Sequence, residues 1–427
     1  MLKIKRWREK DNMLKIEKEI IDKSNEAIKL CKEAFKEIEE IEEHNQQRML
    51  KAFIKNGVSE VDLGISTGYG YGDRGRETLD KIYAEYFKTE DALVRHNFVC
   101  GTHALTVALF GILRPKDTML CVTGTPYDTL KGVIGLDGKN SGSLKDFNIN
   151  YEQVDLKEDG SLNFEEMKKR INKDIKLVYI QRSRGYNTRP SLFVKDIEEI
   201  VKITKELSPK TIVMVDNCYG EFVEMKEPTM VGVDLMVGSL IKNPGGGIAP
   251  TGGYIVGKKY LIEKCSYRLT TPGIGKEVGA TLGTNRELFM GTFSAPHVTA
   301  EALKTSIFAA ALFSLLGFEV TPKYNEDRAD IIEVLKLGDR EKLISFCEGI
   351  QSGSPVDSFL KPEPWDMPGY DNQVIMAAGA FTLGASIELS ADAPLREPFA
   401  VFLQGGINFY SAKFSLMLAA NKLLKNK

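Results

Sequence analysis

The sequence lacks the features that mark several common protein classes. Its 427 residues include only four histidines, none in a pair with the spacing of metal ligands, so a zinc site is not expected. The six cysteines are scattered and form no Cys-x-x-Cys pair, which favours a reduced, cytoplasmic protein. The net charge of −2 gives no basis for binding nucleic acid or an anionic membrane surface.

Long apolar runs are also scarce. The longest, Ile307 to Phe318, is too short to cross a bilayer and predicts a buried helix. The first twenty residues alternate basic and acidic side chains without an apolar core, so no secretory signal is predicted. No Gly-x-Gly-x-x-Gly follows a strand, which disfavours a nucleotide-binding oxidoreductase, and the run Gly138 to Ser141 lacks the Gly-Lys-Ser/Thr of a P-loop.

The remaining pattern predicts two domains behind an N-terminal helical segment. With 43% hydrophobic residues, the chain is long enough for a sizeable core. Amphipathic spacing predicts that the N-terminal segment, 1–60, forms two helices that break near Asn25. Strands alternate with helices from 92 to 257, which predicts an α/β fold with a mainly parallel sheet in a large domain, 61–299. A helix from about Val298 to Phe318 then leads into a smaller C-terminal α+β domain, 300–427.

One lysine stands in an unusual place. Lys242 follows an apolar run, Val231 to Val237, that suits a buried strand, and it precedes a proline and three glycines. Lysine is rarely buried unless it is paired, and desolvation at a strand end lowers its pKa and makes it a usable nucleophile. Such an amine forms a Schiff base with an aldehyde, and pyridoxal phosphate (PLP) is the aldehyde that we expect. A solvated turn lysine is the alternative.

A second strand end supports the PLP hypothesis. The short apolar run Thr211 to Val215 ends at Asp216. PLP needs a carboxylate against its pyridine nitrogen, which keeps that nitrogen protonated and the ring an electron sink. Parallel sheets bind ligands at the carboxyl ends of their strands, where Asp216 is predicted to lie. The alternative is that Asp216 caps a helix or is a solvated strand end.

Other polar groups fall at the same predicted edge of the sheet. Gly101 and Thr102 open a helix and offer backbone N–H groups to an anion, unless they belong to an ordinary capped helix. Tyr127 follows another strand, where an aromatic ring can lie flat on a planar cofactor. The polar run Gln181 to Asn187 follows a third. Because such strand ends converge on one crevice, we predict a single site there.

The loop Gly64 to Arg76 is rich in glycine and tyrosine. It is too irregular for a helix or a strand and is either a flexible connection or a phosphate-binding loop. Its two arginines and two tyrosines are groups suited to binding a phosphate.

These motifs together resemble a known family. From the tyrosine-rich loop to Arg396, the chain is similar to the fold-type I PLP enzymes of the cystathionine/methionine γ-lyase group. It is most similar to the methionine γ-lyase-like branch often labelled aluminium-resistance proteins. The resemblance implies that Lys242 forms the Schiff base with PLP and that Asp216 pairs with the pyridine nitrogen. It also implies that Tyr127 stacks on the cofactor ring.

The resemblance assigns further residues to the phosphate and the substrate. Gly101 and Thr102 would bind the phosphate through backbone N–H groups, and Ser239 would add a hydroxyl. Tyr69 and Arg74 resemble the Tyr and Arg that reach the phosphate from a neighbouring subunit, which implies a homo-oligomer, a dimer or a tetramer, with shared active sites. Arg396 resembles the arginine that holds the carboxylate of a small amino-acid substrate.

The chain departs from the family pattern at two places. Ile241 stands where the group usually has a threonine before the lysine, so one phosphate hydroxyl is missing. Where the group has a loop with Pro and Asn for the ring hydroxyl, this chain has Gln181 to Asn187, and the residue that serves there is left open. Arg182 or Arg184 is an alternative to Arg396 for the substrate carboxylate.

The function expected from the resemblance is that of a PLP-dependent carbon–sulfur lyase. It would act on an amino acid, a sulfur-containing one, through deprotonation at Cα and β- or γ-elimination. An aminotransferase and an aldolase-type lyase share the cofactor and remain alternatives. A catalytically silent PLP-fold binding or stress protein is the alternative from another class, against which the intact Lys242 and Asp216 argue.

Overall fold

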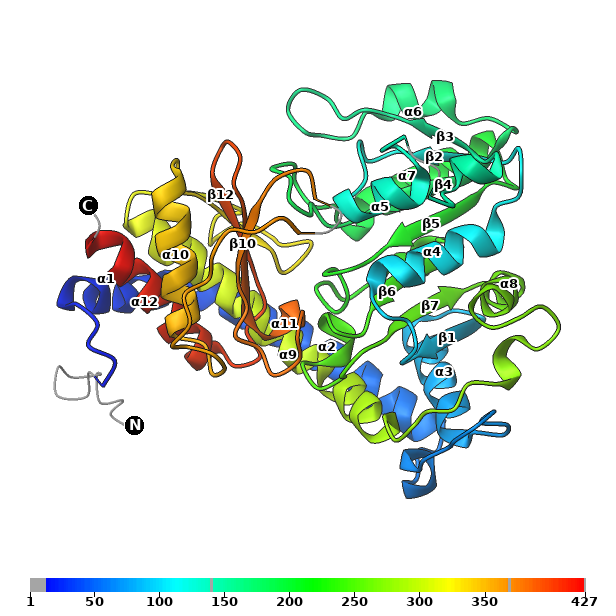
Figure 1. Ribbon diagram of the computed structural model, residues 1–427, viewed down its shortest axis with the longest axis horizontal. Helices are drawn as coiled ribbons and strands as arrows, with labels where there is room; N and C mark the ends of the chain where they lie inside the picture. The colour runs from blue at the N-terminus through cyan, green and yellow to red at the C-terminus, as the bar shows by residue number, and fades with distance from the viewer. Residues whose placement is uncertain (1–12, 139–140, 368–369, 426–427) are drawn as a thin grey trace.

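The computed structural model, which describes residues 13–138, 141–367 and 370–425, contains two sheets in separate parts of the molecule (Figure 1). The strands of the larger sheet are β1 (Asp91–Arg95), β2 (Thr118–Cys121), β3 (Asn150–Gln153), β4 (Ile175–Gln181), β5 (Ile212–Asp216), β6 (Leu235–Ser239) and β7 (Gly253–Gly257). Those of the smaller sheet are β8 (Glu319–Thr321), β9 (Glu333–Lys336), β10 (Val374–Ala377), β11 (Ser390–Pro394) and β12 (Ala400–Gln404).

The larger sheet is mainly parallel, as predicted. Its strand order is β1-β7-β6-β5-β4-β2-β3, and the strands from β6 to β3 all pair in parallel. Strand β7 runs antiparallel to both β6 and β1. The parallel strands therefore end along one edge, where the sequence places its polar groups.

Helices cover both faces of this sheet because its strands are apolar on both faces. In β5, Val213 and Val215 pack in one hydrophobic cluster, while Ile212 and Met214 pack in another on the opposite face. The helices around the sheet are α3 (Arg74–Phe87), α4 (Gly101–Ile112), α5 (Asp128–Ile134), α6 (Phe164–Arg170), α7 (Val194–Leu207) and α8 (Lys259–Leu269). Helices α3, α6 and α7 lie with the first cluster, and α4, α5 and α8 with the second.

The smaller sheet is antiparallel throughout, with the order β10-β11-β12-β9-β8. It packs with α10 (Arg340–Ser352), α11 (Ser386–Leu389) and α12 (Phe409–Lys425) in a third hydrophobic cluster. The α/β large part and the smaller α+β part confirm the predicted fold class.

The N-terminal helices lie along the long helix α9 (Asn285–Leu315), as Figure 1 shows. They are α1 (Lys18–Leu30) and α2 (Lys32–Lys55). The break predicted near Asn25 is wrong, because α1 continues to Leu30 and Cys31 separates the two helices. The buried Ala27 and Cys31 pack against α9 in one cluster, so tertiary packing extends the first helix past the polar asparagine. Residues 1–12 of the predicted segment lie outside the described residues.

Helix α9 begins earlier than the sequence predicts. It starts at Asn285, not near Val298, and Pro296 lies inside it. A proline removes one helical hydrogen bond, but Leu288, Phe289 and Ala295 are buried in the core of the large sheet and hold the first turns in place. Residues 299 and 300, the predicted domain boundary, therefore fall within one continuous helix. The division into two domains stays a prediction.

The length of α9 also bears on the expectation about membranes. The predicted apolar run was too short to cross a bilayer, but the whole helix is long and apolar enough by composition. Within its most apolar stretch, 78% of the residues are buried inside the protein. The prediction of a buried helix is therefore right, although α9 is longer than the run on which it was based.

Candidate active site

A cavity of about 280 Å³ lies at the carboxyl ends of β5 and β6, between the two parts of the chain. We call it the active-site pocket. From the large part it is lined by Gly101, Thr102, Tyr127, Asp216, Ser239 and Lys242, and from the small part by Tyr370, Met376, Ser386, Ser390 and Asp392, among others. The structure thus brings together six residues that the sequence predicts for one site.

Lys242 leaves the sheet just after β6 and just before the short 3-10 helix η5 (Asn243–Gly245). Its Nζ lies 3.9 Å from the centre of the Tyr219 ring. Burial lowers the pKa of Lys242. The thiol of Cys218, the hydroxyl of Tyr219 and the carboxylate of Asp216 raise this pKa by more, so that the net pKa lies above that of a free lysine. The sequence-based expectation of a lowered pKa is therefore wrong for the protein alone, because it counted burial and not the acidic neighbours.

Asp216 is buried at the end of β5, with 8% of its surface exposed. The Tyr179 hydroxyl donates to its Oδ2 at 3.3 Å, and the backbone N–H of Cys218 donates to its Oδ1 at 3.1 Å. Two donors orient the carboxylate and leave acceptor positions for a protonated ring nitrogen, since a carboxylate has about four lone-pair sites.

The start of α4 forms an anion cradle beside Lys242. The first N–H groups of a helix have no intrahelical partner, and Gly101 and Thr102 occupy those positions at the pocket wall. The buried Oγ of Ser239 has no hydrogen-bond partner among the described residues. A Cβ on Gly101 would lie only 3.3 Å from the Cβ of Ser239 and 3.4 Å from the Cys218 Sγ, so glycine keeps the approach open. These groups fit a phosphate, and with Lys242 and Asp216 they fit PLP.

Tyrosine rings line the same pocket. The hydroxyls of Tyr127 and Tyr370 lie 2.5 Å apart, within hydrogen-bond distance. The Tyr186 ring lies 5.6 Å from both of their ring centres. Gln181 accepts a hydrogen bond from the Tyr127 backbone N–H at 2.7 Å, which fixes the start of α5. Burial raises the pKa of the Tyr127 hydroxyl well above its usual value, so it stays protonated at neutral pH.

Asp392 is a buried carboxyl group that the sequence analysis did not single out. It accepts hydrogen bonds from Ser390 Oγ at 2.6 Å, from Gln404 Nε2 at 2.6 Å and from the Tyr186 hydroxyl at 2.8 Å. Burial raises its pKa, while these donors and the Lys242 charge lower it in part. The small part of the chain therefore brings an acidic group to the same pocket.

Arg182 does not line the pocket, although the sequence made it a candidate for the substrate carboxylate. Its fully buried guanidinium donates to Asn217 Oδ1 at 2.9 Å, to the Gly220 carbonyl at 2.8 Å and to Glu224 Oε1 at 2.6 Å. Its Nε donates to the Leu192 carbonyl at 3.2 Å. The side chain is held inside the large part of the chain, which does not support a substrate role.

The two other candidate arginines lie closer to the domain boundary. Arg184 is buried and donates to the Thr321 carbonyl at 3.1 Å. Arg396 is half-buried, and its Nη2 donates to the Tyr186 carbonyl at 3.1 Å. Arg396 thus contacts the backbone of Tyr186, a residue that lines the pocket, and its role stays a prediction.

Tyr69 and Arg74 lie on the surface, away from the pocket of their own chain. Tyr69 is 72% exposed and stacks on the equally exposed Tyr71, with ring centres 5.4 Å apart. The Arg74 side chain is 57% exposed, and its Nε pairs with the buried Asp62 at 2.9 Å. Neither residue lines the active-site pocket of its own chain.

Sequence reasoning missed several residues of the pocket, among them Tyr186, Tyr219, Tyr370 and Asp392. Tyr186 lies inside the polar run Gln181 to Asn187, and Tyr219 stands three residues after Asp216, so closeness to a strand end was the available signal for these two. Tyr370 comes from an irregular segment of the small part and has no such signal. Its position depends on how the two parts pack.

Comparison with known proteins places the chain among relatives of the same size. It is 50% identical over 393 residues to protein YnbB of Bacillus subtilis (strain 168), covering 92% of this chain and 93% of that one. A solved carbon–sulfur lyase involved in aluminum resistance from Clostridium novyi NT is 54% identical, with a TM-score of 0.92, and the match covers 95% of this chain and 96% of that one.

A more distant structure shares the fold alone. The pyridoxal-5'-phosphate-dependent protein YhfS from Escherichia coli is 15% identical, with a TM-score of 0.59 over 90% of this chain and 97% of that one. This likeness agrees with the PLP fold type I. A family model described as methionine gamma-lyase matches residues 20–424, and the chain therefore belongs to the methionine gamma-lyase family.

Proposed function

We propose that this protein is a PLP-dependent carbon–sulfur lyase that acts on a sulfur-containing amino acid by β- or γ-elimination. The observation that supports this most is the meeting of Lys242, Asp216 and the unpartnered Ser239 hydroxyl in one pocket. The family and the carbon–sulfur lyase from Clostridium novyi point to the same class of enzyme.

Different residues of the pocket would bind different parts of the cofactor. PLP, when bound, supplies an aldehyde for the lysine and a ring that withdraws electrons from the substrate. Gly101, Thr102 and Ser239 would hold the phosphate, and the positive end of α4 adds to the attraction. Asp216 would keep the pyridine nitrogen protonated, since its carboxylate is buried and already oriented.

The pocket also contains the groups that elimination requires. The Lys242 amine would take the proton from Cα, after which the carbon–sulfur bond breaks and its electron pair leaves with the sulfur. Tyr127 would cover the ring face. Walls from both parts of the chain line the pocket and reduce the contact of the reacting groups with water, which strengthens the electrostatic interactions inside.

The first test is the visible absorption spectrum of the purified protein, with and without added PLP. We expect a yellow band that borohydride abolishes and that Lys242→Ala lacks. Incubation with sulfur-containing amino acids should then release thiol, keto acid and ammonia. Exchange of the amino group in place of ammonia release would indicate an aminotransferase, and a colourless protein that does not take up PLP would contradict the proposal.

We propose in addition that the active site is shared between copies of the chain in a homo-oligomer. Tyr69 and Arg74 are exposed and lie outside their own pocket, so the family role of these residues requires a second copy. Mixed oligomers provide the test. Arg74→Ala and Lys242→Ala should each be inactive alone, and mixing the two after mild dissociation should restore part of the activity. A double variant mixed with Lys242→Ala should restore none.

A further inference from the structure

Tyr219 has a backbone conformation that is rare for its residue type. Its φ is +73°, in the left-handed region that favours glycine and disfavours bulky side chains. Such strain persists only where the surrounding structure enforces it, and it is concentrated at functional sites. Tyr219 follows Asp216 by three residues and lines the active-site pocket.

The strained backbone directs the Tyr219 side chain to two contacts. The centre of its ring lies 3.9 Å from the Nζ of Lys242, the distance of a close cation–π contact. Its hydroxyl lies 3.1 Å from Ser386 Oγ, at the start of α11 in the small part of the chain. The ring therefore spans from the lysine in the large part to the facing wall.

We propose that Tyr219 is a positioning residue, whose ring holds the Lys242 amine in the pocket and whose hydroxyl ties that ring to the small part of the chain. The proposal rests on the proposed function only in taking Lys242 as the reactive amine. The left-handed backbone is what allows a side chain so close to Asp216 to turn toward Lys242.

The ring acts on the charge of Lys242 together with other groups around it. Asp216, Cys218 and Glu221 face the lysine from the large part, and Asp392 and Tyr370 from the small part. The face of the Tyr219 ring adds a contact that favours the ammonium without adding an anion. Loss of the ring should therefore release the free amine at lower pH.

The test measures the reactivity of Lys242 in the protein without PLP, so that it does not depend on lyase activity. An amine-reactive label such as trinitrobenzenesulfonate is applied over a pH series, and its extent at the Lys242 peptide is read by mass spectrometry. In Tyr219→Leu we expect the pH midpoint to fall by about one unit, the tenfold change that a buried cation–π contact supports. Tyr219→Phe, which keeps the ring and loses only the hydroxyl, should move the midpoint clearly less than Tyr219→Leu does.

Equal midpoints in Tyr219→Leu and the wild type would overturn the proposal. So would a Tyr219→Phe variant that shifts as far as Tyr219→Leu, because the hydroxyl and not the ring would then be responsible. If Tyr219→Leu does not fold, Tyr219→Asn decides, since Asn tolerates the left-handed conformation and also lacks the ring.

Two control variants separate the role of Tyr219 from general effects. Lys88→Asn changes another residue with a positive φ, +55°, at the exposed end of α3. Tyr410→Leu removes an exposed tyrosine on α12. Neither should move the Lys242 midpoint. If the Lys242 midpoint falls as expected in Tyr219→Leu but the wild-type protein shows no lyase turnover, the proposed function is contradicted and this inference is not.

Discussion

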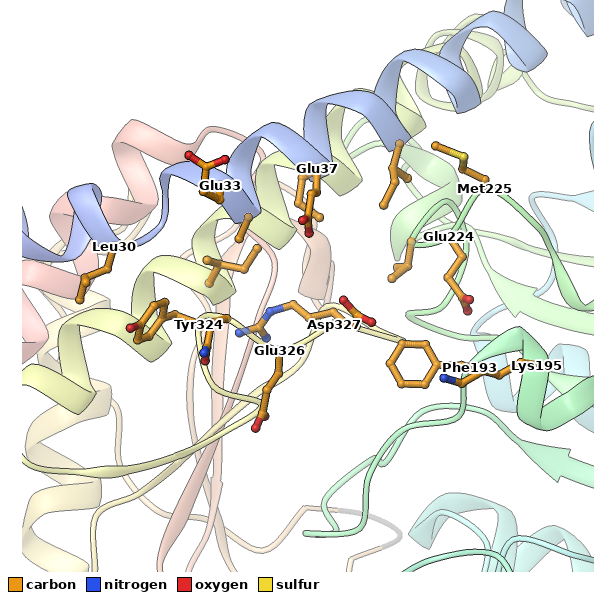
Figure 2. A pocket seen from close by; sticks show the side chains of 17 residues that line it. Leu30, Glu33, Glu37, Phe193, Lys195, Glu224, Met225, Tyr324, Glu326 and Asp327 are labelled. Carbon is orange, nitrogen blue, oxygen red and sulfur yellow. The ribbon is translucent and has the colours of Figure 1, made fainter.

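Two cavities of the molecule differ in size and in chemistry. The groove beside α2 has a volume of about 490 Å³, against about 280 Å³ for the active-site pocket. Figure 2 shows this α2 groove between Glu33 and Glu37 on α2, the loop with Tyr324 and Asp327, and Phe193 at the start of α7. Its carboxylates at Glu33, Glu37 and Asp327 are exposed at the rim.

The difference lies in where the ionisable groups face. In the active-site pocket Lys242, Asp216 and Asp392 face one another under cover, where the dielectric constant is low and each charge acts strongly on the next. In the α2 groove, Glu33 and Glu37 face water, which screens them. The smaller cavity, where a lysine amine faces two buried carboxylates, is therefore the better candidate active site, and cavity volume alone does not identify it.

The strongest test of the difference between the two cavities is to remove one carboxylate from each. Asp216→Asn should lower kcat/KM on the order of a hundredfold or more, because the buried charge that supports the cofactor ring is lost. Glu37→Gln, at the exposed rim of the groove, should change kcat/KM and the free energy of unfolding within experimental error. Equal losses in the two variants would show that the groove takes part in the reaction.

Arg182 connects the two cavities and should matter for stability. Its guanidinium pairs with Glu224, which lines the α2 groove, while its backbone N–H donates to the Asp216 carbonyl at 3.1 Å. Arg182→Met leaves buried acceptors without a donor and should lower the free energy of unfolding by about 3–5 kcal/mol in urea titrations. A raised KM with unchanged stability would instead indicate the substrate role that the structure does not support.

Ser239 offers a finer test of the pocket, because its hydroxyl is buried without a partner. Ser239→Ala should raise the dissociation constant of PLP roughly tenfold, since a hydrogen bond to a charged group contributes about 1.5–3 kcal/mol. Without PLP the variant should melt at the same temperature as the wild type or higher, because an unsatisfied polar group is removed. Melting scans with and without PLP measure both effects, and a lower melting temperature without PLP would contradict this account.

A further expected effect is a difference in pH dependence between buried acids near the two cavities. Burial raises the pKa of Glu221 from 4.5 to about 8, and that of Glu333, paired with the groove residue Arg328, to about 7. A raised folded-state pKa means that the folded protein binds more protons than the unfolded chain, so this part of its stability falls as pH rises from 4.5 to the folded value.

Glu221→Gln removes that titration and keeps an acceptor for the Tyr254 hydroxyl, which lies 2.7 Å from Glu221 Oε1. Its stability relative to the wild type should therefore rise up to about pH 8, whereas Glu333→Gln should stop gaining near pH 7. Urea titrations at several pH values measure both curves. If the free energy of unfolding of both variants changes with pH as it does in the wild type, neither acid takes up a proton in the folded protein.

The sequence predicts much of the fold and the cofactor side of the pocket. Strand ends are local features, and a parallel sheet brings them to one edge, so Lys242, Asp216 and Gly101 could be placed together without knowing the rest. A strand end does not reveal which way its side chain turns. Arg182 follows the same rule of position, yet its guanidinium turns inward to Glu224.

The substrate side could not be predicted in the same way. Tyr370 and Asp392 reach the pocket only through the packing of the small part against the large one, which no local pattern encodes. The prediction of a lowered pKa for Lys242 was wrong for a related reason. Burial can be inferred from an apolar run, but the acidic neighbours that outweigh it become known only with the fold.

Helix α9 has a consequence for how this protein can be taken apart or recombined. Its first turns complete the core of the large sheet through Leu288 and Phe289, and its last turns complete the core of the small one through Ile307 and Phe308. A cut between residues 299 and 300 leaves both fragments with an open core. A chimera with a relative should therefore take the whole helix 285–315 from one parent, because its first and last turns support different cores.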